Sequence, residues 1–208
     1  MGAYWDDRYG REGKIWGTTP SVTAGQACRE FRGRGVRRVL VPGAGYGRNA
    51  ALFARAGFDV TGVEVSAEAV RLAEGDGVRY IPGSFLEVDL EADAYDAVYC
   101  HNVLHLFLAP DRRRFVARCA AALRAGGLAF FAVFSDEEPS YGKGRRVEAD
   151  TYESKPGRPV HYFSERDLRD HLAGFDVLEI GTVEEPEEHG EEGPHVHRLR
   201  FVLAGRKG

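Results

Sequence analysis

The stretch VLVPGAGYGRNA, residues 39–50, decides the fold of this chain. Its first three residues form a short apolar run, which is typical of a strand buried in a parallel sheet. Glycines follow at three alternate positions, Gly43, Gly45 and Gly47. A helical pattern then begins at Asn49 and ends at Gly57. A strand, a glycine turn and a helix in this order bring backbone N–H groups and a helix N-terminus up to a ligand.

The second predicted strand, residues 59–63, is followed by Glu64. A carboxylate at this point is placed to accept hydrogen bonds from the ribose hydroxyls of an adenosine-containing cofactor. Dinucleotide sites have the spacing G-x-G-x-x-G, which puts the third glycine where this chain has Arg48. The spacing here is G-x-G-x-G, and it resembles the loop that binds S-adenosylmethionine in class I methyltransferases. We therefore expect S-adenosylmethionine as the cofactor rather than a nicotinamide dinucleotide.

Bulk composition is that of a soluble protein of 208 residues, with 43% hydrophobic and 29% charged residues and a net charge of −4. Basic residues are scattered, which argues against nucleic acid as a partner. No apolar run reaches the roughly 18 residues of a membrane span, and the N-terminus has no secretory pattern. Cys28, Cys100 and Cys119 lack metal or redox spacing, so we expect free buried thiols and a cytoplasmic location. Monomer and homodimer both remain open.

Predicted strands and helices alternate along most of the chain. The strands are expected at residues 39–41, 59–63, 78–81, 95–99, 128–134, 177–180 and 199–204. Helices are expected at 21–31 with Ser21 as N-cap, at 49–57, after Ser66, across Phe115 to Leu123 with Gly126 and Gly127 as the stop, and after Ser164. The pattern predicts one α/β domain over residues 1–208, with a Rossmann-like, doubly wound, seven-stranded, mostly parallel sheet and an antiparallel last strand.

Three segments interrupt this alternation. Residues 1–20 hold two tryptophans before any periodic pattern, and they are either a clasp on the core or a lid over the cofactor. Residues 135–163 form a long connection rich in Gly, Pro and charge, and connections of this length are usually lids or insertions. Residues 184–197 are expected as an acidic turn between the last two strands.

Most of the chain, from about residue 4 to 204, resembles the class I S-adenosylmethionine-dependent methyltransferases. The resemblance rests on GAGYG, Glu64, Gly83-Ser84-Phe85, YDAVYCHN and LRAGGLAFF. The opening YWDDRYG with the later Trp16-Gly17 is similar to the small-molecule branch that includes the tellurite-resistance and thiopurine methyltransferases. This resemblance implies methyl transfer from S-adenosylmethionine to a small-molecule acceptor.

The resemblance also implies a set of cofactor-binding residues. Gly43, Ala44 and Gly45 would pass under the methionine part, within a turn completed by Gly47 and Asn49. Glu64 would hold the ribose, while Val65, Ser84 and Phe85 would border the adenine. Cys100 and His101 would face the methionine carbon chain, and Tyr9 or Trp16 would reach its carboxylate. Two departures stand out: no acidic residue is present near Val41 and Pro42 for the methionine ammonium, and Ser84 stands where an aspartate is common.

Candidate catalytic residues follow the fourth predicted strand: His101, Asn102 and His105. Methyl transfer from a sulfonium is an in-line displacement, for which an enzyme mainly supplies positioning. A base is needed only when the nucleophile carries a proton of high pKa. The spacing His101-x-x-x-His105 also places two imidazoles on one face of a helix, as in some metal sites, but without a third ligand.

Candidate substrate-binding residues lie in the late segments: Tyr141, His161, Tyr162, His195 and His197. His189, His195 and His197 stand among six glutamates, so a transition-metal site and a solvated acidic loop are both open readings; we predict no metal. If the last strand has already begun, the spacing His195-x-His197 puts both rings on one face.

The acceptor is not identified by the sequence. The Asn/Asp-Pro-Pro-Tyr tetrapeptide of enzymes that methylate exocyclic amines is replaced by His101-Asn102-Val103-Leu104. Thiols, metalloid oxyanions, halides and small amines or hydroxyls remain candidates. The alternatives to a methyltransferase are a non-catalytic adenosyl- or metal-sensing module and a nicotinamide-dependent oxidoreductase.

Overall fold

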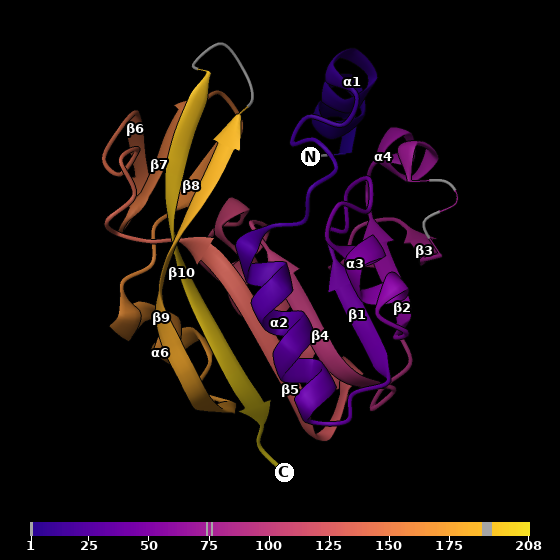
Figure 1. Ribbon diagram of the computed structural model, residues 1–208. Helices are drawn as coiled ribbons and strands as arrows, with labels where there is room; N and C mark the ends of the chain where they lie inside the picture. The colour runs from indigo at the N-terminus through magenta and orange to yellow at the C-terminus, as the bar shows by residue number, and fades with distance from the viewer. Residues whose placement is uncertain (1, 74, 76, 189–192) are drawn as a thin grey trace.

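Figure 1 shows the protein as a computed structural model, which describes residues 2–73, 75, 77–188 and 193–208. In chain order its elements are α1 (Gly2–Glu12), α2 (Val22–Gly33), β1 (Arg38–Pro42), α3 (Ala50–Arg55), β2 (Asp59–Glu64), α4 (Ala67–Leu72), β3 (Arg79–Pro82), β4 (Tyr95–His101), η1 (Leu104–Leu106), α5 (Ala109–Ala122), β5 (Leu123–Phe134), β6 (Arg145–Glu148), β7 (Thr151–Lys155), β8 (Arg158–His161), α6 (Glu165–His171), β9 (Phe175–Glu188) and β10 (Pro194–Arg206). None of the helices in the described part is long and apolar enough to span a membrane.

Seven strands form one sheet in the order β3-β2-β1-β4-β5-β10-β9. The strands from β3 to β5 are parallel to one another, and β10 pairs antiparallel with both β5 and β9. The predicted fold class is therefore confirmed. The order of strands reverses between β1 and β4, and in such sheets ligands bind outside the carboxyl ends of the strands at that point.

Apolar side chains cover both faces of the sheet. Phe31 of α2 and Phe53 of α3 pack on one face with alternate residues of β1 and β4. Phe115 of α5 and Leu168 of α6 pack on the other face with the intervening strand residues. Because successive strand residues point to opposite faces, the central strands are apolar throughout, as expected for a sheet covered on both sides.

Two connections carry more structure than the sequence indicated. Residues 135–163 contain β6, β7 and β8, which form a separate three-stranded antiparallel sheet. The acidic turn expected at 184–197 is wrong in its extent, because residues up to Glu188 continue β9 and residues from Pro194 already belong to β10. Backbone pairing of β9 with β10 extends to Pro194 and Glu188, so the long hairpin rises above the sheet beside β7 and β8 (Figure 1).

The end of the fifth helix also differs from the prediction. Leu123 was expected on the helix and Gly126 and Gly127 as its stop, but α5 ends at Ala122. Leu123 has extended backbone angles and pairs with Tyr95 of β4. The strand therefore begins before the two glycines, since pairing with β4 fixes the backbone there.

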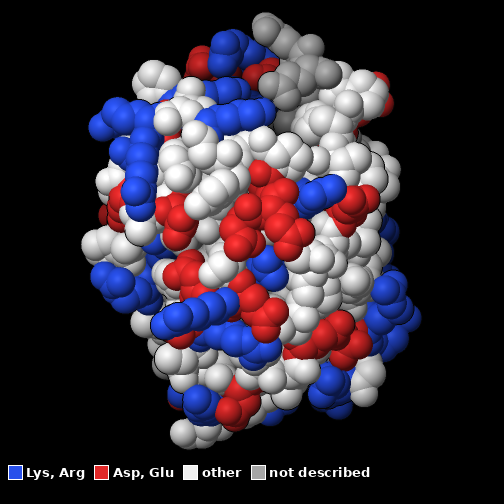
Figure 2. All heavy atoms as spheres, turned by 90° about the vertical axis from the view of Figure 1, so that its left-hand side faces the viewer, with Lys and Arg blue, Asp and Glu red and all other residues white. Residues whose placement is uncertain are grey.

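The outer strand β9 forms one edge of the large sheet. Several of its outward side chains are charged, including Asp176, Glu179 and Glu184. Figure 2 shows basic and acidic groups interspersed on this side of the molecule. Charge along an exposed strand discourages pairing with a strand from another chain.

Candidate functional site

A cavity of about 1490 Å³ lies outside the carboxyl ends of β1, β2 and β4. Gly43, Glu64 and His101 line it at the ends of these three strands. Residues of α1, β8 and the β9–β10 hairpin line it from the opposite side, and Figure 1 shows these elements above the sheet. The cavity thus occupies the position where the strand order predicts a ligand.

The glycine turn fits closely against its neighbours. Gly43 has φ +64°, and a Cβ there would lie 2.5 Å from a methyl of Val103. Gly45 has φ +56°, and a Cβ there would lie 3.1 Å from the hydroxyl of Tyr9. Left-handed backbone and close approach both require glycine at these positions, so the turn can lie directly beneath a ligand.

Glu64 is buried and bonded to the glycine turn. One carboxylate oxygen accepts the Gly45 N–H at 2.7 Å, and the other accepts the Ser66 N–H at 2.8 Å. Burial raises the pKa of the Glu64 carboxyl, while these backbone N–H groups act in the opposite direction. Each carboxylate oxygen has two lone pairs, so each can accept a further hydrogen bond from a ligand in the cavity.

The predicted borders of the adenine lie beside Glu64. Val65, Ser84 and Phe85 line the cavity together with Ala44. Val65 is 36% exposed although its side chain is apolar. An apolar surface next to a carboxylate at the end of β2 suits a base attached to a ribose.

The N-terminal segment is held against α4 and also lines the cavity. Asp6 of α1 accepts hydrogen bonds from the Ser66 hydroxyl at 2.7 Å and from the Glu68 N–H at 3.2 Å. Tyr9 and Trp16 pack with Tyr46 of the glycine turn, and all three line the cavity. Burial raises the pKa of Tyr46 to about 12. The N-terminal segment is therefore attached to the core and also forms part of the cavity wall.

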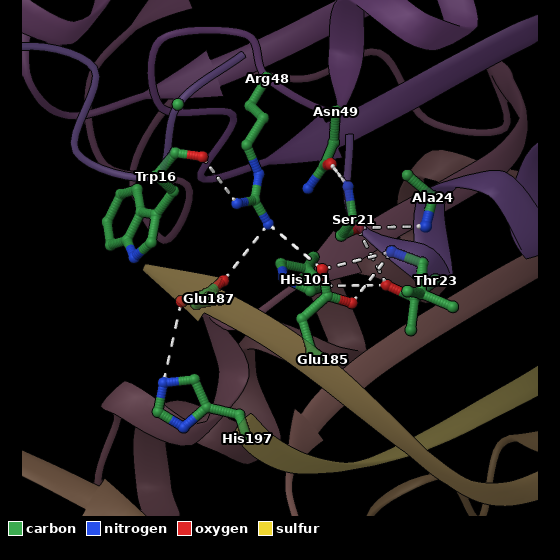
Figure 3. A network of polar contacts seen from close by, with 12 residues as sticks. Trp16, Ser21, Thr23, Ala24, Arg48, Asn49, His101, Glu185, Glu187 and His197 are labelled. Atoms are coloured by element: carbon green, nitrogen blue, oxygen red, sulfur yellow. Dashed lines mark hydrogen bonds and ion pairs between the residues drawn. The ribbon is translucent and has the colours of Figure 1, made fainter. Parts of the chain in front are cut away.

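Arg48 joins the glycine turn to two distant segments (Figure 3). Its guanidinium donates to the carbonyl of Trp16 at 3.1 Å and lies 3.3 Å from Glu187 and 3.6 Å from Glu185. Glu185 also accepts the N–H of Val22 at 2.9 Å. Sequence reasoning missed this connection, because an arginine after the glycines has no local pattern that points to residues 139 positions away.

His101 and Asn102 present buried polar atoms to the cavity. Nδ1 of His101 lies 2.9 Å from the Thr23 hydroxyl, while its Nε2 is buried without a hydrogen-bond partner among the described residues. Burial and the charge of Arg48 lower the pKa of His101 to about 3, so the ring is neutral at pH 7. Asn102 has a left-handed φ of +55°, and its buried Oδ1 likewise has no partner in the described part of the chain. Unpartnered buried polar atoms and strained backbone are both typical of functional sites.

His105 lines the cavity but is not placed as a base. Its Nδ1 accepts the N–H of Phe134 at 3.2 Å, so in the neutral ring Nε2 carries the proton. The predicted pairing of His101 and His105 on one helix face is also wrong. His101 ends β4 and His105 lies in η1, and the left-handed Asn102 between them interrupts any helix.

Three predicted cofactor-binding residues have surroundings other than those expected. Cys100 is completely buried in the core on the face opposite to its neighbour, and burial raises its pKa to about 12, so it does not face the ligand. Gly47 borders a separate depression with Tyr46 and Ala51. Asn49 lines the cavity, but its Oδ1 accepts the N–H of Ser21 at 2.9 Å and so holds the start of α2.

The predicted substrate residues divide into two groups. Tyr162, His195 and His197 line the cavity. Tyr141 donates its hydroxyl to Asp150 at 2.8 Å, outside the cavity.

His161, the remaining substrate candidate, is buried away from the cavity. Its two ring nitrogens lie 2.8 Å from the Thr151 hydroxyl and 2.7 Å from Asp167. Both nitrogens are therefore occupied by the contact between the small sheet and α6, and the prediction that His161 binds substrate is wrong.

The β9–β10 hairpin places two of the three suspected histidines together. His195 and His197 project from the same face of β10, as their spacing predicted. Burial disfavours the charged form of His197, but a hydrogen bond to Glu138 and the nearby carboxylates together raise its pKa. Glu138 was not among the sequence candidates, since it lies 59 residues from His197. His189 lies outside the described residues.

Comparison with known proteins indicates a methyltransferase domain. Residues 40–131 match a family model described as a methyltransferase domain. A ubiquinone biosynthesis O-methyltransferase of Bordetella avium is 32% identical over 113 residues, which cover 50% of this chain and 46% of that protein. The chain spans about half the length of most of the curated relatives it matches.

Solved structures share the fold over nearly the whole chain. The 1,6-didemethyltoxoflavin N1-methyltransferase of Burkholderia thailandensis, with 1,6-didemethyltoxoflavin and S-adenosylhomocysteine bound, is 24% identical with a TM-score of 0.70, covering 99% of this chain and 85% of that one. A structure from work on the conversion of a disulfide bond into a thioacetal group in echinomycin biosynthesis is 21% identical with a TM-score of 0.77, covering 100% and 93%.

Proposed function

We propose that this chain, which belongs to the class I S-adenosylmethionine-dependent methyltransferases, transfers the sulfonium methyl group of S-adenosylmethionine to a small molecule bound in the same cavity. The observation that carries the proposal is Glu64, a buried carboxylate at the end of β2 that shares the cavity with the glycine turn and with His101.

The donor would lie along the ends of β1 and β2. Glu64 would accept hydrogen bonds from both ribose hydroxyls through the lone pairs that Gly45 and Ser66 leave free. Val65 and Phe85 would enclose the adenine between apolar surfaces. The ribose contact would use a charged acceptor, and hydrogen bonds to charged groups contribute about 1.5–3 kcal/mol each.

The methionine part would extend toward α1. Arg8 is buried and lines the cavity, and its guanidinium lies 5.4 Å from the ring of Trp16. A buried cation there supports an interaction with the donor carboxylate. The Tyr9 hydroxyl, which lies close to Gly45, is a second candidate for this end of the donor.

The acceptor would occupy the part of the cavity between His101 and the hairpin. Three aromatic side chains, Phe107, Phe134 and Tyr162, are among the residues that line the cavity. The similar proteins named above include a ubiquinone biosynthesis O-methyltransferase and a 1,6-didemethyltoxoflavin N1-methyltransferase, so small ring compounds with a hydroxyl or a ring nitrogen are the first acceptors to test.

Methyl transfer requires the enzyme mainly to align the acceptor with the methyl group of the donor. The acceptor's lone pair attacks the methyl carbon in line with the S–CH₃ bond, and the neutral thioether of S-adenosylhomocysteine leaves. The buried Nε2 of His101 and Oδ1 of Asn102 would orient the acceptor through hydrogen bonds.

Since all three cysteines are free, we also infer a reducing cytoplasmic environment.

Calorimetric titration with S-adenosylmethionine, S-adenosylhomocysteine and NAD in parallel tests the donor site. We expect micromolar binding of both adenosyl ligands and none of NAD. Radiolabelled S-adenosylmethionine with a panel of phenols, ring nitrogens and thiols then tests turnover. Binding of NAD alone would overturn the proposal, and donor binding without transfer to any acceptor would favour a non-catalytic adenosyl module.

A further inference from the structure

Three potential metal ligands converge on the inner face of the β9–β10 hairpin: Glu187, His195 and His197. His195 pairs directly across the two strands with Glu187, and His197 follows two residues later on the same face. One atom from each side chain lies within 4.8 Å of the other two. The Nε2 atoms of the two histidines are 3.2 Å apart, and Nε2 of His197 is 3.8 Å from a Glu187 oxygen.

The second nitrogen of each ring fixes which nitrogen carries the proton. Nδ1 of His195 lies 2.8 Å from the carbonyl oxygen of Gly193, and Nδ1 of His197 lies 3.0 Å from a carboxylate oxygen of Glu138. A carbonyl and a carboxylate oxygen only accept hydrogen bonds, so both Nδ1 atoms are donors. In the neutral rings, both Nε2 lone pairs therefore point into the space beside the Glu187 carboxylate. The three side chains thus offer electron pairs to one space, where a shared proton or a metal ion can bind.

These distances suit a transition-metal ion. Ligands at about 2.0–2.2 Å from a tetrahedral zinc ion are roughly 3.3–3.6 Å from one another, and the distances of 3.2 and 3.8 Å between these atoms bracket that range. Histidines that bind a metal usually donate their other N–H to a carboxylate or a backbone carbonyl. Glu138 and Gly193 supply one of each.

The charge around the cluster also favours a divalent cation. The side chains of Glu138, Glu185 and Glu187 are each at most 4% exposed. Arg48 lies within 4 Å of two of these carboxylates and supplies one positive charge (Figure 3). Buried carboxylates close to one another favour positive charge between them, and a divalent ion would supply it.

We propose that Glu187, His195 and His197 bind one divalent transition-metal ion of the Zn²⁺ type, with Glu138 and the Gly193 carbonyl orienting the two rings. Imidazole ligands select such ions over Mg²⁺ and Ca²⁺. Because all three ligands line the cavity, an ion bound there would be accessible to the acceptor, as in sites that have three protein ligands and one exchangeable position.

This position indicates a hydroxyl-bearing acceptor, an inference that rests on the proposed methyl transfer. A metal-bound hydroxyl loses its proton to solvent more readily, since the ion lowers the pKa of the bound oxygen. The oxygen's electron pair then forms the O–CH₃ bond while the S–CH₃ bond breaks, and S-adenosylhomocysteine leaves as a neutral thioether. No oxidant or further reactant is required.

Metal titration of the whole protein tests the site without relying on activity. The chain is treated with a chelator, dialysed and titrated calorimetrically with Zn²⁺, and Co²⁺ serves as a visible-absorption probe of its ligands. We expect one ion per chain. His195→Ala, His197→Ala and Glu187→Gln should each weaken binding by more than about 100-fold, and Glu138→Gln by about 10–100-fold because it acts through His197.

Glu184→Gln is the matched control, because Glu184 lies on the same strand with a side chain that is 68% exposed. It should bind Zn²⁺ as the wild type does. Thermal melting without metal establishes that each variant is folded.

Two outcomes would overturn the inference: no stoichiometric Zn²⁺ binding by the folded wild type, or equal affinity in the ligand variants and the control. The cluster would then hold a proton between its rings. S-adenosylhomocysteine binding, measured on the same metal-free samples, keeps the two proposals apart. Its loss would count against the methyltransferase function, whereas its presence without metal binding would count only against the metal site.

Discussion

Replacement of Glu64 by glutamine is the most direct test of how this chain holds its donor. The carboxylate is 6% exposed and lies at the end of β2, with one oxygen on the N–H of Gly45 and the other on the N–H of Ser66. Glutamine keeps the shape of the side chain but offers a single acceptor oxygen and two N–H donors. The variant therefore removes the charge and one acceptor while leaving the packing almost unchanged.

The size of the effect follows from the hydrogen bonds lost. A hydrogen bond to a charged group contributes about 1.5–3 kcal/mol. Loss of one such bond to the ribose should raise the Kd for S-adenosylhomocysteine by about 10- to 150-fold, since about 1.4 kcal/mol corresponds to a factor of ten. The amide nitrogen would also face one backbone N–H of Gly45 or Ser66, so the ligand-free variant should melt at a lower temperature than the wild type.

Isothermal titration calorimetry with S-adenosylhomocysteine measures the affinity, and a thermal melt of the same sample reports the fold. Glu68→Gln is the control, because Glu68 lies four residues further on and pairs with Arg71 at the surface. It should bind as the wild type does. If Glu64→Gln folds and keeps the wild-type affinity, the ribose is held elsewhere and our placement of the donor is refuted.

Three further predictions concern the pH dependence, the glycine turn and the core. Burial raises the pKa of Glu64, so the affinity for S-adenosylhomocysteine should fall as the pH is lowered toward that pKa. The fall should begin at a higher pH than it would if the carboxylate were exposed. An affinity that stays constant between pH 7 and 4 in calorimetry would contradict this. Gly43→Ala should destabilise the fold by about 2–4 kcal/mol in urea unfolding, because it combines left-handed strain with a collision against Val103. Gly13→Ala has the same φ of +64° with nothing within 4 Å, so equal losses in both variants would show that the collision costs nothing. Cys100 should resist iodoacetamide at pH 8 in the native protein, since burial raises its pKa to about 12; rapid labelling detected by mass spectrometry would place this thiol outside the core.

The features that predict a donor site are local in the sequence. The apolar run before Gly43, the glycine spacing and the carboxylate of Glu64 depend on backbone geometry and on residues a few positions apart. Ser21 and Ser66 cap their helices as predicted, because a cap is a hydrogen bond to an N–H three residues ahead.

The direction in which individual side chains point was predicted less well, for reasons that lie in the tertiary structure. Cys100 and His101 are adjacent in sequence, but strand alternation turns one into the core and the other into the cavity. His161 was expected at the substrate, yet Thr151 and Asp167 take both of its nitrogens. The type of residue makes each of these a candidate, whereas the direction of its side chain depends on tertiary packing.

The sequence by itself therefore determined the α/β fold, the seven strands of its main sheet, and the turn and carboxylate that suit an adenosyl donor. The tertiary structure alone decided which side chains meet across the cavity. Arg48 contacts Glu187 over a separation of 139 residues, and Glu138 orients His197 over 59. Side chains along a strand or helix repeat with a short fixed period, which a sequence pattern can show. Contacts between residues this far apart depend on how the folded elements pack, so no local sequence pattern predicts them.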